Sequence, residues 1–207
     1  MKIIVAVSLV FFLFGCATGT GTVYIAKTES ESIESTYKDP RAQSLHQKNS
    51  DLIRDIYWRL IQSNVGIYRR GIGITTLTDQ NNEQLHYLMI NIRPSEVYFD
   101  ENTTKPEDRF SRVLMTELPK YLKFIKSSDL DRDDIKGLAF GIYWPVRDYS
   151  QCNTYGGFIE YIHVYFSKND AQDILEGRRP YADSLTEDVE IITSLDLKPA
   201  KSVRPVF

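Results

Sequence analysis

Apolar residues recur with two different periods along the chain, and together these periods predict both helices and strands. Over residues 40–64 and 106–125 they return every three or four positions, the period of an amphipathic helix. Shorter stretches alternate every second position or are continuously apolar, and turn-forming residues bound them, which is typical of strands. These strand-like stretches cover residues 71–78, 85–92, 138–146, 158–166 and 189–195.

Residues that favour helix ends support these boundaries. Asp39-Pro40 provides an N-cap side chain followed by a proline in the first turn of the first helix. The second helix begins at Pro106, and Pro119 interrupts it, so either the helix kinks there or a second short helix starts. A third short helix follows Ser167, which is also a favourable N-cap residue.

The predicted elements follow the order helix, hairpin, helix, hairpin, helix, strand. Hairpins dominate over strand–helix–strand units, so we expect an α+β fold with a mostly antiparallel sheet of about five strands and helices packed on one face. Residues 40–195 form a single domain in this interpretation, followed by a C-terminal tail over residues 196–207. Gly71 and Gly73 share one face of the first hairpin, which favours a close approach by a helix or a β-bulge there.

The first sixteen residues differ in composition from the rest of the chain. Lys2 precedes an apolar run, Ile3 to Phe14, that only Ser8 interrupts, and a glycine stands directly before Cys16. A membrane-spanning helix needs ~20 apolar residues, and this run is shorter. A buried core helix would not need its basic residue at the extreme N-terminus. The pattern therefore predicts a secretory signal peptide over residues 1–15.

The end of this segment, Leu13-Phe14-Gly15-Cys16, resembles the lipobox of bacterial lipoproteins. In that family the cysteine is lipidated, with palmitate among the acyl groups, and becomes the mature N-terminus, so the resemblance implies lipidation of Cys16 and attachment to a membrane. Ala17 stands where aspartate would favour the inner membrane, which implies the outer membrane with the protein facing the periplasm.

Residues 16–39 are interpreted as the lipidated N-terminus and a flexible tether. They begin with small residues and continue into a cluster of glutamates and serines, so they offer little apolar surface to offset the entropy of ordering. Such a segment suits the task of holding a domain away from a membrane.

Composition and charge exclude some classes of protein. Hydrophobic residues make up 42% of the chain and aromatic residues 12%, which is typical of a folded domain rather than a disordered one. The formal net charge is −3 and basic residues are not clustered, so we expect no nucleic-acid partner. The chain has two cysteines, and lipidation of Cys16 would leave Cys152 without an intrachain partner, so we expect no disulfide.

Residues with catalytic chemistry are scattered along the chain. His46, His86 and His163 lie on separate predicted elements, and none has a second ligand at the spacing of a zinc site. His46 is expected to be a solvated surface residue. Cys152 and His163, with a carboxylate such as Glu160, are the one arrangement that would suit a hydrolase. However, strand geometry places His163 ~20 Å from the loop that contains Cys152, and Glu160 on the opposite face.

One acidic stretch has part of a calcium-binding pattern. Asp129, Asp131 and Asp133 alternate like the first ligands of a calcium loop. Asp134 stands where such a loop has glycine, and Phe140 where it has a bidentate glutamate, so we interpret the stretch as a polar connection. We therefore expect no metal or other cofactor.

The strand over residues 158–166 separates apolar from aromatic side chains. Phe158, Ile162, Val164 and Phe166 alternate with a second set, Tyr161, His163 and Tyr165, and Tyr143 on the preceding strand is expected beside that second set. Tyrosine and histidine are also common on any half-exposed strand face, and the tether or the tail could simply cover them.

We interpret the aromatic set as a binding surface, because amphipathic rings combine contact area with a polar group. The loop over residues 147–157 extends this candidate surface with Arg147 and Tyr155. The favoured interpretation is a lipid-anchored, non-enzymatic binding, scaffold or assembly module of the cell envelope. Its partners are the membrane, through the lipid, and another envelope protein or a cell-wall component. The alternatives are a periplasmic hydrolase with a dispersed site and a lipoprotein that binds a small ligand.

Overall fold

The computed structural model describes residues 25–79, 82–150, 157–185 and 189–194. The predicted signal peptide, the lipidated Cys16 and the tail over residues 196–207 lie outside these described residues, as do Cys152 and Tyr155. In the described part of the chain no helix is long and apolar enough to cross a membrane.

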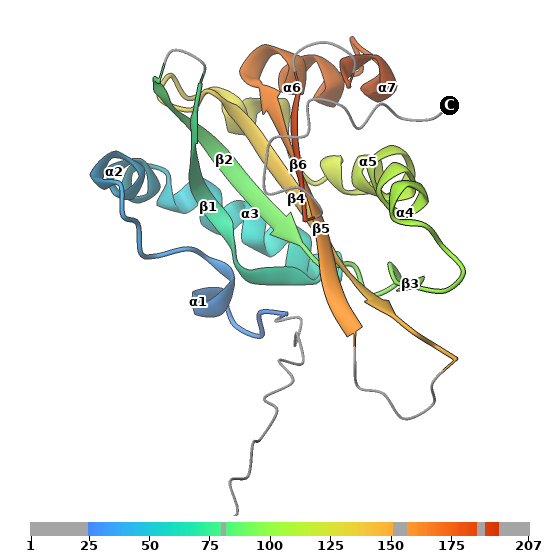
Figure 1. The fold of residues 1–207 in the computed structure, drawn as a ribbon. Helices are drawn as coiled ribbons and strands as arrows, with labels where there is room; N and C mark the ends of the chain where they lie inside the picture. The colour runs from blue at the N-terminus through green and yellow to red at the C-terminus, as the bar shows by residue number, and fades with distance from the viewer. Residues whose placement is uncertain (1–24, 80–81, 151–156, 186–188, 195–207) are drawn as a thin grey trace, which may run out of the picture.

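One mixed sheet organises the described chain (Figure 1), in the order β1-β2-β4-β5-β6 with β3 paired to β4. The β1–β2, β4–β5 and β5–β6 pairs are antiparallel, whereas β2–β4 and β3–β4 are parallel. The strands are β1 (Ile67–Thr78), β2 (Gln84–Ile92), β3 (Phe99–Asp100), β4 (Gly137–Arg147), β5 (Gly157–Ser167) and β6 (Glu190–Thr193).

The α+β class and the mostly antiparallel sheet are confirmed. The described residues contain six strands rather than about five, because the two-residue β3 forms between the second and third predicted strands, where no strand is expected. The parallel β2–β4 pair arises because the chain between these strands crosses over through helices instead of turning directly back.

The helices begin and end close to the predicted signals. Asp39 caps the first predicted helix by accepting a hydrogen bond from the amide of Arg41 at 2.9 Å, and that helix is divided at Asn49. The α-helices are α1 (Glu29–Ser32), α2 (Pro40–Lys48), α3 (Ser50–Gln62), α4 (Pro106–Arg112), α5 (Leu118–Leu122), α6 (Lys168–Leu175) and α7 (Tyr181–Ser184). A π-helical turn, η1 (Val113–Glu117), joins α4 to α5, and a 3₁₀ turn, η2 (Ser127–Leu130), follows.

The π-helical turn resolves the ambiguity at Pro119. Proline has no amide hydrogen and its ring crowds the carbonyl four residues earlier, so a regular α-helix cannot pass through it unchanged. The chain widens into η1 immediately before this position, and α5 then begins at Leu118 with the proline in its first turn.

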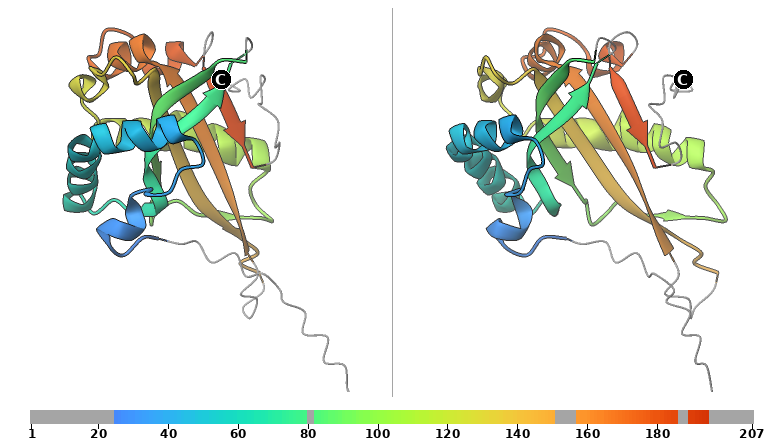
Figure 2. Two further views of the ribbon diagram at one scale, coloured as in Figure 1. Left: turned by 90° about the vertical axis from the view of Figure 1, so that its left-hand side faces the viewer. Right: turned by 60° about the vertical axis from the view of Figure 1, so that its left-hand side comes forward.

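A single hydrophobic cluster fills the space between the helices and one face of the sheet. Figure 2 shows α2 and α3 on the same side of the sheet, and the side chains of α3, α4, η1, α5 and α6 join this cluster. On the sheet side it contains alternate residues of the central strands, including Phe140, Ile142 and Trp144 of β4, all 0% exposed. The described helices therefore leave the other face of the sheet to a different set of side chains.

Residues 25–39 differ from the predicted flexible tether. Ile25 forms a β-bridge with Tyr68 and Ile33 forms one with Ile72, while α1 lies between these two bridges. The amide of Ala26 donates to Ile67 O at 2.9 Å, and the amide of Glu34 donates to Ile72 O at 2.8 Å. Because β1 is an edge strand, its outer backbone groups need partners, and this segment supplies them. The described tether residues therefore belong to the domain.

The expected irregularity near Gly71 and Gly73 is present. A β-bulge lies between Ile67 and Ile72, where Arg70 has a φ of 53°. A Cβ atom on Gly73 would lie 2.4 Å from the hydroxyl of Tyr37, so the glycine permits the docked segment to approach β1.

A buried ion pair fixes β5 against α4. Glu160 accepts two hydrogen bonds from Arg109, at 2.8 Å from Nε and 2.5 Å from Nη2, and a third from Trp144 Nε1 at 2.9 Å. Arg109 also donates to the carbonyl of Thr104. The two charged side chains are 2–3% exposed. The sequence predicted the core-facing direction of Glu160 but not its partner.

Removal of one member of this pair is expected to destabilise the fold strongly. In Glu160→Gln or Arg109→Met, the remaining polar group stays buried without its charge partner, which should lower the free energy of unfolding by about 3–5 kcal/mol. Urea denaturation monitored by tryptophan fluorescence measures this change. The double variant Arg109→Met/Glu160→Met should cost clearly less than the sum of the single variants, and an additive result would contradict direct coupling.

Candidate functional site

The sheet face opposite the core gathers six aromatic side chains from four strands. Register explains the grouping, since Tyr143 of β4 pairs with Tyr161 of β5, and His163 and Tyr165 follow on the same face. The structure thus brings together the four residues that the sequence singled out. It adds one tyrosine from β1 and one from β2. The resulting aromatic face consists of Tyr68, Tyr87, Tyr143, Tyr161, His163 and Tyr165.

Four rings of the aromatic face contact one another. Tyr68 stacks on Tyr143 with the ring centroids 3.9 Å apart and the planes 11° from parallel. Tyr143 lies 5.3 Å from Tyr161 and 5.5 Å from His163, and those two rings are 5.1 Å apart. Such offset and tilted arrangements are favourable for aromatic pairs. These four rings therefore form a preorganised layer rather than a set of independent side chains. Tyr87 and Tyr165 form a separate edge-on pair on the same face, with their centroids 5.5 Å apart.

Small residues on β4 make room for this layer. A Cβ atom on Gly141 would lie 2.1 Å from Asn91 Oδ1 and 2.5 Å from His163 Cδ2. A Cβ atom on Gly137 would lie 2.8 Å from the ring of Tyr87. Both glycines stand on the aromatic side of β4, so larger residues there would displace the rings.

The aromatic face is uncharged at neutral pH. Burial lowers the pKa of His163 from 6.5 to about 4, so its imidazole is neutral at pH 7. A hydrogen bond of 2.8 Å joins its Nε2 atom to the hydroxyl of Tyr143. Burial also raises the pKa of Tyr143 and of Tyr165, so both phenols stay protonated. The layer can therefore offer polar contacts without carrying a charge of its own.

Two arginines lie beyond one end of the aromatic face. Arg147, predicted as a site residue, is the exposed last residue of β4 and falls on the aromatic side by alternation. Arg93, which the sequence analysis missed, directly follows β2 and continues the alternation of Tyr87, Met89 and Asn91. That alternation is the signal that could have identified it.

These two guanidinium groups are not neutralised within the described chain. Burial, and then the charge of Arg147, lower the pKa of Arg93. The Nε atom of Arg93 is buried without a hydrogen-bond partner, and neither arginine forms an ion pair with a described carboxylate. The site therefore combines a neutral aromatic layer with two arginines that form no ion pair with a described carboxylate.

The grouping considered for a hydrolase is not assembled by the described residues. Glu160 lies on the core face, 1% exposed and bonded to Arg109, whereas His163 lies on the opposite face. Cys152 is outside the described residues.

The predicted polar connection holds its aspartates apart. Asp129 contacts Arg59 and the amide of Lys126, both at 2.8 Å, while Asp131 accepts from Gln172 at 2.7 Å. In the ranges that the structure describes, no three His, Cys, Asp or Glu side chains are grouped so as to hold a metal ion.

Comparison with known proteins finds no matching family model, no matching curated protein and no matching solved structure.

The pKa of His163 leads to a pH dependence of stability. Its folded value of about 4 lies below the ordinary 6.5, so the unfolded chain binds a proton more readily between these pH values. This residue should therefore lower the free energy of unfolding by about 2–3 kcal/mol when the pH falls from 7 to 4.5. The variant His163→Gln should lack this part of the dependence. Urea denaturation of both proteins at the two pH values gives the difference, and identical pH profiles would contradict a buried, neutral His163.

Proposed function

We propose that this protein is a lipid-anchored, non-enzymatic binding module of the cell envelope, and that its aromatic face binds a partner protein there. The observation that carries the proposal is the set of six aromatic rings on the sheet face opposite the helices, four of them in mutual contact, with Arg93 and Arg147 near one end. The lipobox-like segment ending at Cys16 supports the anchor, and Ala17 supports an outer-membrane position facing the periplasm.

The chemistry of the aromatic face suits a protein interface. Tyrosine and arginine are enriched in the cores and hot spots of such interfaces. Tyr143, Tyr161 and Tyr165 are half-buried, so part of each ring remains accessible. Because neighbouring rings already hold one another, little side-chain entropy remains to be lost when a partner binds. A neutral layer also avoids the cost of desolvating a charge at the centre of the contact.

The arginines define the charge of the partner. Two guanidinium groups that lack described carboxylate partners favour a surface that carries aspartate or glutamate side chains. We therefore expect the partner to place an acidic segment at the Arg93–Arg147 end and apolar or aromatic side chains over the tyrosines.

Photo-crosslinking in cells tests the proposed surface. A photoreactive residue in place of Tyr161 or Tyr165 in the full-length protein should give one reproducible adduct with a second envelope protein. The same residue at Lys123, which is exposed immediately after α5 on the helical side, is the matched control and should not give that adduct. An abundant, folded protein without an adduct from either tyrosine position would contradict the proposal.

Charge reversal at the positive end should weaken the same contact. Arg147→Glu would place a negative charge opposite the expected acidic segment, and we expect a loss of roughly tenfold in the yield of the Tyr161 adduct. Arg132→Glu changes the charge equally at an exposed residue outside the aromatic face and should leave the yield unchanged. Equal effects of the two variants would show that overall charge, and not this site, controls binding.

A further inference from the structure

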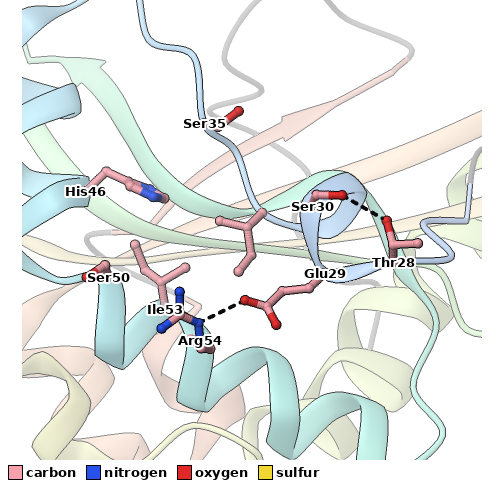
Figure 3. A pocket seen from close by; sticks show the side chains of 9 residues that line it. Thr28, Glu29, Ser30, Ser35, His46, Ser50, Ile53 and Arg54 are labelled. Atoms are coloured by element: carbon pink, nitrogen blue, oxygen red, sulfur yellow. Dashed lines mark hydrogen bonds and ion pairs between the residues drawn. The ribbon is translucent and has the colours of Figure 1, made fainter.

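A second concave site lies away from the aromatic face, between the docked N-terminal segment and the helices α2 and α3. Its volume is about 470 Å³, which is within the range of small-molecule pockets. Figure 3 shows side chains that approach the space from two walls, with Thr28, Glu29 and Ser30 from the α1 side and His46, Ser50 and Arg54 from the α2–α3 side. The pocket exists only because residues 25–39 dock on the domain.

One ion pair spans the two walls of this pocket. Arg54 Nε donates to Glu29 Oε1 at 2.9 Å. Within the described chain, the second carboxylate oxygen of Glu29 and the hydroxyl groups of Ser35 and Ser50 have no hydrogen bond to another residue. The pocket thus presents several donors and acceptors that a bound molecule could satisfy.

His46 contributes a neutral imidazole to the same space, contrary to the expected solvated surface position. It is half-buried because the docked segment covers it, and its Nδ1 atom lies 2.9 Å from the hydroxyl of Tyr37. Burial lowers the pKa of His46 below 6.5, so the ring is uncharged at pH 7. Among the side chains that line the pocket, only Glu29 and Arg54 are therefore charged, and their charges are opposite.

The floor of the pocket is apolar. Ile53 is fully buried, and Ile33 is partly buried against the core. A ligand therefore meets an apolar surface on one side and hydroxyl, carboxylate and guanidinium groups around it. This combination suits a molecule with many hydroxyl groups and one exposed C–H face.

We infer that this pocket binds a neutral polyhydroxylated molecule of the size of a mono- or disaccharide. Sugar hydroxyl groups can donate to the second oxygen of Glu29 and accept from Arg54 while the ion pair stays closed. A zwitterion such as a short peptide would have to break the Glu29–Arg54 ion pair. Its own charged groups would then only replace that pair, so little binding free energy would be gained. The arrangement therefore favours the neutral ligand.

Binding at this site would also secure the docked segment. The ligand would contact α1 and α3 at once, so its binding free energy would add to the stability of the α1–α3 contact. The amides of Ile33 and Glu34, which donate to Glu29 O and Ile72 O, report on this contact by hydrogen exchange.

Nuclear magnetic resonance titration with cellobiose and N,N′-diacetylchitobiose tests the inference. At least one of these neutral disaccharides should shift backbone signals of α1, Ser35 and Ser50 in the wild-type protein and slow exchange of the Ile33 and Glu34 amides. Arg54→Met should weaken binding by about tenfold, equivalent to 1.4 kcal/mol. The matched control Arg41→Met removes an exposed arginine of α2 that does not line the pocket, and should bind as the wild type does.

Ser50→Ala provides a second, milder variant, since it removes one hydroxyl group at the start of α3 and leaves the ion pair in place. It should weaken binding a few-fold without changing the unliganded spectrum elsewhere. The inference would be overturned if neither disaccharide shifted the backbone signals at about 20 mM. It would also be overturned if the shifts mapped to another surface, or if Arg54→Met and the wild type bound with equal affinity. Binding of alanyl-alanine in preference to the sugars would overturn the neutral assignment.

Discussion

The alternation of side chains along the β4–β5 ladder determines which residues enter the core and which form the aromatic face. Eleven consecutive residue pairs, from Gly137↔Ser167 to Arg147↔Gly157, hold the two strands in one register. A slip of β5 by one residue would turn its apolar side chains toward the aromatic side and its rings into the core. The register is secured on both faces, by the Glu160–Arg109–Trp144 contacts on one and by the fit of His163 over Gly141 on the other.

This alternation also determines which features could be predicted from the sequence. The helical periods, the hairpins and the common face of Tyr143, Tyr161, His163 and Tyr165 are local patterns, and the structure reproduces them. The positions of Tyr68 and Tyr87 on the same face are not local, because they depend on how β1 and β2 align with β4 across the parallel pair. The sequence of a strand shows which of its side chains share a face, but it does not show which strand lies beside it in the sheet.

Three further features required tertiary information for similar reasons. Arg109 and Glu160 are 51 positions apart, and each by itself would be expected at the surface. Residues 25–39 are polar enough to be interpreted as a tether, yet they order because the edge of β1 offers backbone groups that need partners. His46 is half-buried because that segment covers it, and this burial lowers its pKa. In each case a tertiary contact between residues far apart in the sequence overrides the local expectation.

The bridge between Ile25 and Tyr68 has a consequence for geometry at the membrane, because Tyr68 belongs to the aromatic face. The chain therefore enters the domain beside the aromatic face. With the proposed lipid on Cys16, the segment that connects the bilayer to this point comprises residues 16–25 and can span at most ~32 Å. Such a short connecting segment would keep the aromatic face close to the membrane surface. A partner attached to the same membrane would be present there at a high effective concentration. Recognition there could rest on a contact too weak to form between the same two proteins in free solution.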